Sequence, residues 1–412
     1  MSVETCDLSA PAFKRDPYPF YARLRAQEPI KPLIQGDGRL VWLVTRYADV
    51  AAALKDDRLA KDRFNVLTLE EQKRHLPWMP GFVRPLAKNM LDQDPPNHTR
   101  LRALVQKAFT AAYVEKLRGR IESYAHELID GMLARGSADL LNDFALPIPL
   151  RIISDMMGVP AQDRRRFGAW SKKAVSISSG ADALLVIPAF WRFLRFMRGL
   201  IRLRHREPGD DLLSDLVRAE EAGDRLSEDE LLGMVFLLLI AGHETTVNLI
   251  STGMLELIRR PQDLERLRAE PALGRTAVEE LLRFTSPVEF ATERYTREPV
   301  TYLGVTIPAK ERLHLVLGSA NRDEAQFPDP DRLDLARDPN RHLAFGHGIH
   351  YCVGAPLARL EAQIAIRALL ERCAELKLAV PDEQLKWRKG VLLRGLRALP
   401  ARLRAAERRA VA

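Results

Sequence analysis

Cysteine is scarce in this sequence, which contains only Cys6, Cys352 and Cys373. The three residues are widely spaced and odd in number, so we do not expect a disulfide framework. None of them has a second or third cysteine near it at the spacing of a zinc site. Any cysteine chemistry in the protein therefore has to come from a single thiol.

Long hydrophobic runs and a secretory signal are also missing. The longest apolar run, Leu231–Gly242, is too short to cross a bilayer. The N-terminus, MSVETCDLSAPAFKRDPYPF, has no basic region followed by an apolar stretch, so we predict no signal peptide. We therefore expect a cytoplasmic protein with no membrane partner.

Nucleic-acid-binding signatures are absent although the chain is basic. The formal net charge is +8, which would suit nucleic acid, an anionic membrane or an acidic protein. We find no helix-turn-helix, zinc-finger or RNA-recognition pattern. We therefore expect no nucleic-acid partner, and the charge remains compatible with an acidic protein.

The organisation of the chain favours one large fold. Its 412 residues exceed what one hydrophobic core usually supports, so two domains or one multilayered fold are both compatible with the length. No repeat or Gly/Ser-rich linker marks a boundary, and we interpret residues 1–412 as a single domain. Helical periodicity dominates, with a helix over Pro17–Arg25 and a strand over Leu40–Thr45. These patterns predict a mainly α protein with small β-sheets.

A proline-rich segment interrupts the helical pattern between residues 63 and 97. Its prolines break helix repeatedly and predict a long irregular stretch, which is usually functional or mobile in compact proteins. We interpret this segment either as a ligand lid or as a plain surface loop. Helical periodicity then resumes over residues 98–135. The prolines are Pro77, Pro80, Pro85, Pro95 and Pro96.

A strongly amphipathic helix is predicted over Phe190–Arg206. Its arginines recur at spacings of three and four, while apolar residues fall on the other side. A membrane-surface helix is one interpretation, and a core helix with a solvated arginine face is the one we favour. The arginines are Arg192, Arg195, Arg198, Arg202 and Arg206, and the apolar residues are Phe193, Leu194, Met197, Leu200 and Ile201.

An unusually long helix is predicted to follow. Residues 227–230, SEDE, match a capping box, and the helical pattern continues to Ile258. Its centre, MVFLLLIAG, is apolar on every face, so protein should surround it. Polar residues then enter as AGHETT, where Ala241 and Thr245 share a face and a buried Glu244 needs a partner or a proton. A functional site and a locally bent structural helix are both compatible with this stretch.

The stretch FGHGIHYCVG, residues 345–354, places Cys352 among glycines and histidines. Gly346, Gly348 and Gly354 permit unusual backbone angles and the close approach of a flat object, and a helix is predicted to begin at Ala355. That helix N-terminus favours a thiolate, as a metal ligand requires. An inert buried cysteine is the alternative. A single thiolate suits heme iron, whose in-plane bonds come from the cofactor.

This stretch resembles the heme-binding loop of the cytochrome P450 family. The family pattern Phe-Gly-x-Gly-x-His-x-Cys-x-Gly is matched at every fixed position. The resemblance implies the cytochrome P450 fold, with a long central helix over heme b, iron protoporphyrin IX. It also implies that Cys352 is the iron ligand. The matched residues are Phe345, Gly346, Gly348, His350, Cys352 and Gly354.

Further motifs follow the family's order, and the resemblance assigns their roles. It implies that Glu244 and Thr245 are the acid–alcohol pair that delivers protons to bound oxygen. It also implies that Glu280 and Arg283 form a structural ion pair joined by Arg332. The implied heme contacts are His98, Arg102, Ala241, Arg294, Phe345, Gly346, His350 and Gly354.

The implied reaction is the insertion of one oxygen atom from O2 into a C–H bond of a hydrophobic small molecule. The resemblance implies a substrate pocket lined in part by Leu238, Val288, Phe290, Val391 and Leu392, with the terpenoid, steroid, fatty acid and macrolide classes all open. Glu289, between two of them, has two interpretations: it meets a basic or hydroxylated group, or it faces solvent, which is the one we favour.

Electrons must come from another protein, because the chain has no flavin or nicotinamide fingerprint. A ferredoxin or flavodoxin with its NAD(P)H reductase is implied, docking near the Cys352 loop, and we expect a monomer. Two alternatives remain open: a peroxide-driven peroxygenase or rearrangement enzyme on the same scaffold, and a non-catalytic heme-binding sensor.

Overall fold

The computed structural model describes residues 3–406 except residues 69, 73–80, 176–179 and 222–225. The chain divides into two compact units. The larger unit comprises Met1–Val66, Arg118–Ile148 and Thr245–Ala412, and the smaller unit comprises Leu67–Leu117 and Pro149–Glu244. Each unit is described by itself, and the interpretation of residues 1–412 as one domain stays a prediction.

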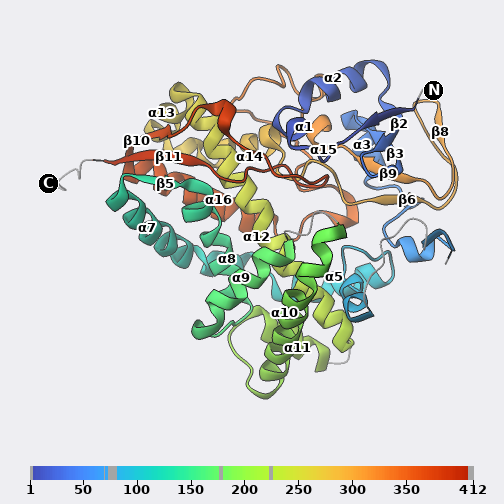
Figure 1. The fold of residues 1–412 in the computed structure, drawn as a ribbon, viewed down its shortest axis with the longest axis horizontal. Coiled ribbons are helices and arrows are strands. Elements are labelled where there is room, and N and C mark those ends of the chain that lie inside the picture. Colours follow the sequence, from blue (N-terminus) through green and yellow to red (C-terminus); the bar gives the residue numbers. More distant parts are fainter. Residues whose placement is uncertain (1–2, 69, 73–80, 176–179, 222–225, 407–412) are drawn as a thin grey trace. The chain divides into compact units, whose positions relative to one another are not determined.

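All three described sheets belong to the larger unit (Figure 1). The six-stranded sheet has the order β1-β2-β3-β9-β6-β4, the three-stranded sheet β10-β11-β5, and the two-stranded sheet β7-β8. The strands are β1 (Glu4–Cys6), β2 (Ile30–Gln35), β3 (Leu40–Val44), β4 (Leu59–Ala60), β5 (Ser137–Asp139), β6 (Arg294–Thr296), β7 (Val300–Tyr302), β8 (Val305–Ile307), β9 (Arg312–Leu315), β10 (Cys373–Leu378) and β11 (Pro400–Ala405).

Strand β3 is the strand predicted at Leu40–Thr45, and it lies inside the six-stranded sheet. It pairs antiparallel with β2 and parallel with β9. Its side chains alternate between two cores, with Trp42 and Val44 in one and Val41 and Leu43 in the other. Because both faces are covered, the strand appears in the sequence as a continuous apolar run.

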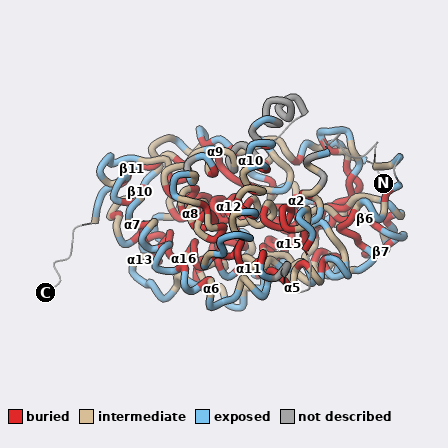
Figure 2. Tube along the Cα trace, turned by 90° about the horizontal axis from the view of Figure 1, so that it is seen from below, coloured by how far each residue is buried: buried red, intermediate tan, exposed pale blue. Residues whose placement is uncertain are grey.

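The helices of the larger unit pack around the last long helix, α16 (Ala355–Arg372). Helices α7 and α14 both contact it, and much of its surface is buried (Figure 2). The helix predicted at Pro17–Arg25 is confirmed as α2. The other helices of this unit are α1 (Pro11–Arg15), α2 (Tyr18–Gln27), α3 (Tyr47–Ala53), η1 (Arg63–Asn65), α7 (Arg118–Arg135), η3 (Leu140–Ala145), α13 (Pro261–Ala269), η5 (Pro271–Leu273), α14 (Gly274–Thr285), α15 (Leu317–Ala320), η6 (Gly348–His350) and η7 (Asp382–Gln384).

The described part of the smaller unit consists of helices and their connections. The amphipathic helix predicted over Phe190–Arg206 is confirmed within α10, which begins ten residues earlier at Gly180. Phe193 packs against Phe167 of α9, with ring centroids 6.1 Å apart. The helices are η2 (Gly81–Ala87), α5 (Asn97–Ala108), α6 (Ala111–Lys116), α8 (Pro147–Met156, shared with the larger unit), η4 (Ala161–Asp163), α9 (Arg164–Val175), α10 (Gly180–Arg206) and α11 (Leu212–Glu221).

The predicted irregular segment 63–97 includes the short helical turns η1 and η2. The predicted helical stretch 98–135 is confirmed as α5, α6 and α7. Residues 69 and 73–80, with Pro77 and Pro80 among them, lie outside the described residues. The interpretation of this segment as a ligand lid therefore stays a prediction.

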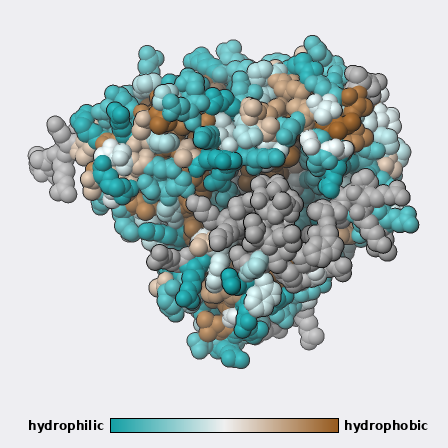
Figure 3. Space-filling model, in the orientation of Figure 1, coloured by the Kyte–Doolittle hydropathy of each residue, from teal (hydrophilic) through white to brown (hydrophobic). Residues whose placement is uncertain are grey.

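The long helix is confirmed as α12 (Glu228–Arg259), which supplies residues to both units. The capping box is formed, because the Ser227 N–H donates to Glu230 Oε2 at 2.8 Å and the Glu230 N–H donates to Ser227 Oγ at 3.2 Å. Helix α12 is long and apolar enough to cross a membrane, but 61% of its most apolar window is buried inside the protein. Burial of that kind is expected for a core helix. Figure 3 shows that one face of the protein surface is mostly hydrophilic, as in soluble proteins.

Candidate active site

The Cys352 loop ends at a helix N-terminus, as predicted. The Cys352 N–H donates to the Phe345 carbonyl at 2.9 Å, which closes the loop into a compact turn. The 18-residue helix α16 begins three residues after Cys352 with Gly354 as its N-cap. Cys352 itself is only partly buried. The positive end of α16 and the accessible sulfur together suit a thiolate that binds a metal.

The glycines of the loop differ in backbone conformation. Gly346 and Gly348 have left-handed backbones, with φ of +71° and +72°, which glycine adopts at least cost. A Cβ on Gly348 would also lie 3.0 Å from the Leu54 carbonyl oxygen. Gly354 has an ordinary φ of −81°, so the prediction of an unusual backbone there is wrong. A Cβ at Gly354 would lie 3.8 Å from the Cys352 Sγ, which is an ordinary van der Waals contact.

A cluster of polar and aromatic side chains holds the loop against α14 and α16. The Arg359 guanidinium donates to both oxygens of Glu279, at 2.6 and 2.8 Å, and lies 4.5 Å from the ring centroid of Phe345. It also donates to the hydroxyl oxygen of Tyr351, within the loop, at 3.3 Å. Burial raises the pKa of Glu279, but hydrogen bonds with His342 and Arg359 outweigh it and hold the pKa at about 2. The carboxylate is therefore charged at neutral pH and fixes Arg359 over the loop.

The predicted propionate partners lie in both units. In the larger unit, Arg294 on β6 is buried and donates to the Thr292 carbonyl at 3.3 Å, and His350 is partly buried at the end of η6. In the smaller unit, His98 is buried and Arg102 is partly buried, one turn apart on α5. Imidazole and guanidinium groups are suitable donors to carboxylates. Their role at a cofactor stays a prediction.

The AGHETT segment lies inside α12, as predicted. Glu244 is buried, Thr245 is partly buried and Ala241 is exposed. Leu238, one turn before Ala241, is partly buried. The helix thus presents the small Ala241 side chain and the Thr245 hydroxyl on one face, where a flat ligand would find space.

A buried carboxylate that we did not predict lies close to this segment. Glu361 of α16 is almost fully buried and shares a hydrogen bond with Thr246, the residue after Thr245. Burial raises the pKa of Glu361 well above its ordinary value, although the hydrogen bond with Thr246 opposes the shift. The sequence gives little indication of this site, because Glu361 is one acidic residue among the apolar residues that recur on the buried face of α16.

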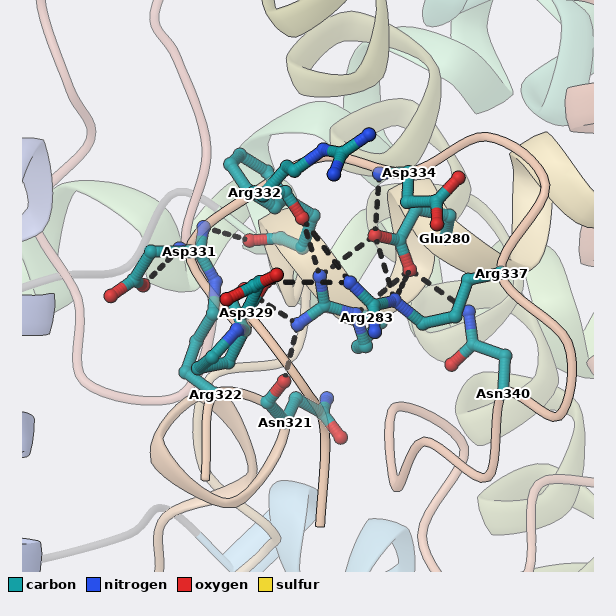
Figure 4. A network of polar contacts seen from close by, with 12 residues as sticks. Glu280, Arg283, Asn321, Arg322, Asp329, Asp331, Arg332, Asp334, Arg337 and Asn340 are labelled. Carbon is teal, nitrogen blue, oxygen red and sulfur yellow. Dashed lines mark hydrogen bonds and ion pairs between the residues drawn. The ribbon is translucent and has the colours of Figure 1, made fainter. Parts of the chain in front are cut away.

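The Glu280–Arg283 pair is confirmed, with Arg283 donating to both oxygens of Glu280 at 2.7 and 2.8 Å. The prediction that Arg332 joins this pair is wrong. Arg337 does so, because its Nε lies 3.1 and 3.2 Å from the two carboxylate oxygens of Glu280 (Figure 4). Arg332 contributes its backbone carbonyl, which accepts from Arg283 at 3.3 Å, while its side chain is exposed.

Two further predictions near the expected substrate pocket are wrong. Glu289 does not face solvent, since its side chain is 1% exposed. It forms an ion pair with the equally buried Lys14 and accepts a hydrogen bond from the Tyr21 hydroxyl at 2.5 Å. Phe290 is fully enclosed in the N-terminal core, edge-on to Tyr21 at 6.2 Å and 5.4 Å from the His314 ring. It is a core residue rather than a pocket residue.

The remaining predicted pocket residues of the larger unit come from two paired segments. Val288 forms a β-bridge with Leu393, and the Glu289 N–H donates to the Leu392 carbonyl at 2.9 Å. Leu392 is exposed, while Val288 and Val391 pack partly against the hydrophobic cores. Lys14 donates to the Val391 carbonyl at 2.6 Å. Their contact with a substrate stays a prediction.

The donor set fits a metal that brings most of its own ligands. Among the residues that the structure describes, no group of three or more His, Cys, Asp or Glu side chains is placed to hold an ion. A partly buried single thiol suits iron in a porphyrin, because the cofactor supplies the other bonds to the metal.

Comparison with known proteins assigns the family. The cytochrome P450 profile matches residues 198–394. The monooxygenase PikC of Streptomyces venezuelae is 47% identical over 95% of this chain and 92% of its own. The solved structure of PksS, from the bacillaene polyketide synthase of Bacillus subtilis, has a TM-score of 0.90 at 42% identity, over 97% of this chain and 100% of its own. P450BioI, solved with an acyl carrier protein ligated to hexadec-9Z-enoic acid, has a TM-score of 0.85 at 37% identity, over 95% and 99%.

The chain belongs to the cytochrome P450 family and has its fold. It is a heme-dependent monooxygenase, an oxidoreductase that uses O2, a hydrophobic substrate and electrons from redox partners. The predictions of family, fold, cofactor and enzyme class are therefore confirmed. The roles of individual residues, the substrate and the identity of the redox partner are taken up below as proposals.

Proposed function

We propose that the Cys352 thiolate would hold the heme iron. The observation that carries this assignment is the position of Cys352, ahead of α16 in a loop closed by its own N–H and the Phe345 carbonyl. When bound, heme activates O2 for insertion into a C–H bond. Gly346, Gly348 and Gly354 would let the backbone approach the porphyrin, and Phe345 would help to hold it.

The heme propionates take the cationic residues as partners in this proposal. Arg294 and His350 act from the larger unit, and His98 and Arg102 from the smaller unit. Four donors against two carboxylates allow each propionate two charge-assisted hydrogen bonds. Ala241 would contact the heme, because its small exposed side chain leaves room for a flat group.

Proton delivery is the role of the Glu244 and Thr245 pair. Glu244 is buried and would supply a proton, which the Thr245 hydroxyl would orient toward the reacting O2. Glu361 supports them from α16, because its hydrogen bond with Thr246 fixes the helix next to Thr245. Retention of this pair favours the monooxygenase over a peroxide-driven peroxygenase or rearrangement enzyme on the same scaffold.

The substrate that these features suit best is a hydrophobic polyketide or fatty-acyl chain. The relative PksS is named for a polyketide synthase, and the relative P450BioI was solved with an acyl carrier protein that holds an acyl chain. Leu238, Val288, Val391 and Leu392 supply apolar contact. We do not propose a non-catalytic heme sensor, because this chain has both members of the acid–alcohol pair.

Electrons come from a ferredoxin or flavodoxin with its NAD(P)H reductase in this proposal. The net charge of +8 suits an acidic redox protein, because complementary charge speeds encounter. The docking site is near the Cys352 loop, where Ile349 and Tyr351 are exposed. We propose that the protein works in the cytoplasm as a monomer.

The experiment that tests the proton-delivery role compares the parent protein with Thr245→Ala and Thr245→Ser. Macrolactones and fatty acids are first screened for a shift of the heme Soret band, and turnover is measured with one that binds. Thr245→Ala should divert most of the consumed NAD(P)H to hydrogen peroxide, and Thr245→Ser should restore coupling. Equal coupling in all three proteins would refute the role.

A further inference from the structure

The arginine face of α10 is not used by the proposed catalytic site. Five arginines recur along it from Arg192 to Arg206, so the stripe is about 21 Å long at 1.5 Å per residue. Four of them, Arg192, Arg195, Arg202 and Arg206, are exposed, and Arg198 is half-buried. A stripe of this length matches one face of a helix in a partner protein.

These guanidinium groups are largely free of acidic partners. Within the described residues, the stripe has one ion pair, between Arg198 and Glu228, whose atoms are 3.9 Å apart. By contrast, Arg204, on another face of the same helix, pairs with Asp211 at 2.8 Å and donates to the Gly158 carbonyl. The exposed arginines are therefore available to an anion or an acidic surface.

An exposed tryptophan belongs to the same stripe. Trp191 is 47% exposed, and the Arg195 guanidinium lies 5.5 Å from its ring. Exposed Trp is uncommon, and Trp and Arg together are enriched in protein interfaces and their energetic centres. The pair marks the N-terminal end of the stripe as the anchoring point of a protein contact.

The opposite face of α10 does not favour insertion of the helix into a membrane. Among the residues of α10 whose side chains the structure describes, the apolar residues of this face are buried in the protein, so they are not available to enter lipid, as a membrane-surface helix requires. Adsorption through the arginines would leave Trp191 as the exposed aromatic anchor of this described part. The buried residues are Phe193, Leu194, Met197, Leu200 and Ile201.

Helix α10 also lies directly against the helix that carries the catalytic segment. Phe190 and Phe193 both meet Phe236 of α12 edge-on, with ring centroids 5.5 and 6.1 Å apart. Phe236 is five residues before Ala241, about 7.5 Å along the helix axis. A partner on the arginine face would therefore be one helix away from the predicted substrate contacts Leu238 and Ala241.

We propose that this face, defined by Trp191, Arg192, Arg195, Arg198, Arg202 and Arg206, docks an acidic helix of an acyl carrier protein. The inference rests on the proposed acyl or polyketide substrate and adds that the chain is delivered while tethered to its carrier. Charge complementarity selects the partner, because an acidic helix presents carboxylates over the same length as the arginine stripe.

The test titrates the heme-loaded protein with three probes: apo acyl carrier protein, decanoyl-acyl carrier protein with a stable amide link, and free decanoic acid. Calorimetry measures carrier binding, and the Soret shift measures entry of the acyl chain. The variant Arg192→Gln/Arg195→Gln/Arg202→Gln is compared with the charge-matched control Arg397→Gln/Arg402→Gln/Arg404→Gln, whose arginines are exposed in the larger unit.

We expect the α10 variant to weaken carrier binding at least about tenfold, with a reduced salt dependence, while binding of free decanoic acid is unchanged. The control should change carrier binding less than twofold. Carrier binding unchanged in the α10 variant would overturn the proposal, as would binding to anionic phospholipid vesicles in place of the carrier. If neither acyl probe shifts the Soret band, the proposed acyl substrate class is refuted. Binding of the apo carrier still tests the docking surface in that case.

Discussion

Arg359 stacks 4.5 Å from the ring centroid of Phe345 while it pairs with both carboxylate oxygens of Glu279. One guanidinium thus joins α14, α16 and the Cys352 loop. A bidentate ion pair and a cation–π contact thus hold the Cys352 loop at this point.

Removing this guanidinium should loosen the loop. We expect Arg359→Leu to lower the free energy of unfolding by about 2 kcal/mol, because it leaves the half-buried Glu279 without its bidentate partner. The heme content of the purified protein should fall as well. Arg367→Leu is the matched control on the same helix, since its exposed pair with Glu371 should contribute less than about 0.5 kcal/mol. Equal losses in the two variants, measured by urea unfolding, would contradict this view.

Glu279 should make stability depend on pH in the acid range. Its pKa is about 2 in the folded protein and 4.5 ordinarily, so unfolding takes up a proton between these values. The contribution is complete above pH 4.5 and is lost as pH falls toward 2. Glu279→Gln should flatten this part of the stability curve, as followed by thermal unfolding between pH 6 and the lowest pH at which the protein stays soluble. A slope unchanged from the parent would refute the assignment.

Arg337 and Arg332 should differ sharply although both are near Glu280. Arg337→Leu removes a cation from a carboxylate that is 0% exposed, which costs about 3 kcal/mol. Arg332→Leu keeps the backbone carbonyl that Arg283 uses and alters only an exposed side chain, so its effect should stay within about 0.5 kcal/mol. Unfolding midpoints in urea measure both. A larger loss in the Arg332 variant would restore the sequence-based assignment.

The Lys14–Glu289 pair should show the penalty of an unpaired buried charge. Burial lowers the pKa of Lys14, and the carboxylate of Glu289 opposes that shift. Lys14→Met should cost about 4 kcal/mol, since it leaves Glu289 with only the Tyr21 hydroxyl. Adding Glu289→Leu and Tyr21→Phe should recover most of the loss, because an apolar cluster replaces the ionic one. Failure of the triple variant to recover would show that this network is needed for reasons other than charge balance.

The features that the sequence predicted well are those set by local pattern. The capping box and apolar centre of α12, the two faces of α10, and the glycines before α16 each depend on residues close together in the chain. The predicted ends of α10 and α12 are close to those observed, whereas α10 begins ten residues earlier than predicted and Gly354 has an ordinary backbone. The cysteine loop was identified for the same reason, since ten consecutive residues contain all of it.

The features that were missed depend on residues far apart in the chain. Glu289 looked exposed because its partner Lys14 is 275 residues away, and Phe290 could not be assigned to the N-terminal core without β3 and α2 in place. Arg337 pairs with Glu280 in the place predicted for Arg332, because the loop between the two arginines turns the Arg332 side chain outward. Glu361 was overlooked because only the packing of α16 against α12 makes its burial visible.

The central claim is that Cys352 supplies the thiolate that holds the heme iron. The reduced carbon monoxide difference spectrum tests it most directly, for the parent protein, Cys352→Ala and the control Cys373→Ala, whose thiol is buried in β10. We predict a red-shifted Soret band of a heme thiolate in the parent and the control, and its loss in Cys352→Ala. Retention of that band in Cys352→Ala, or its absence from the parent, would contradict the account.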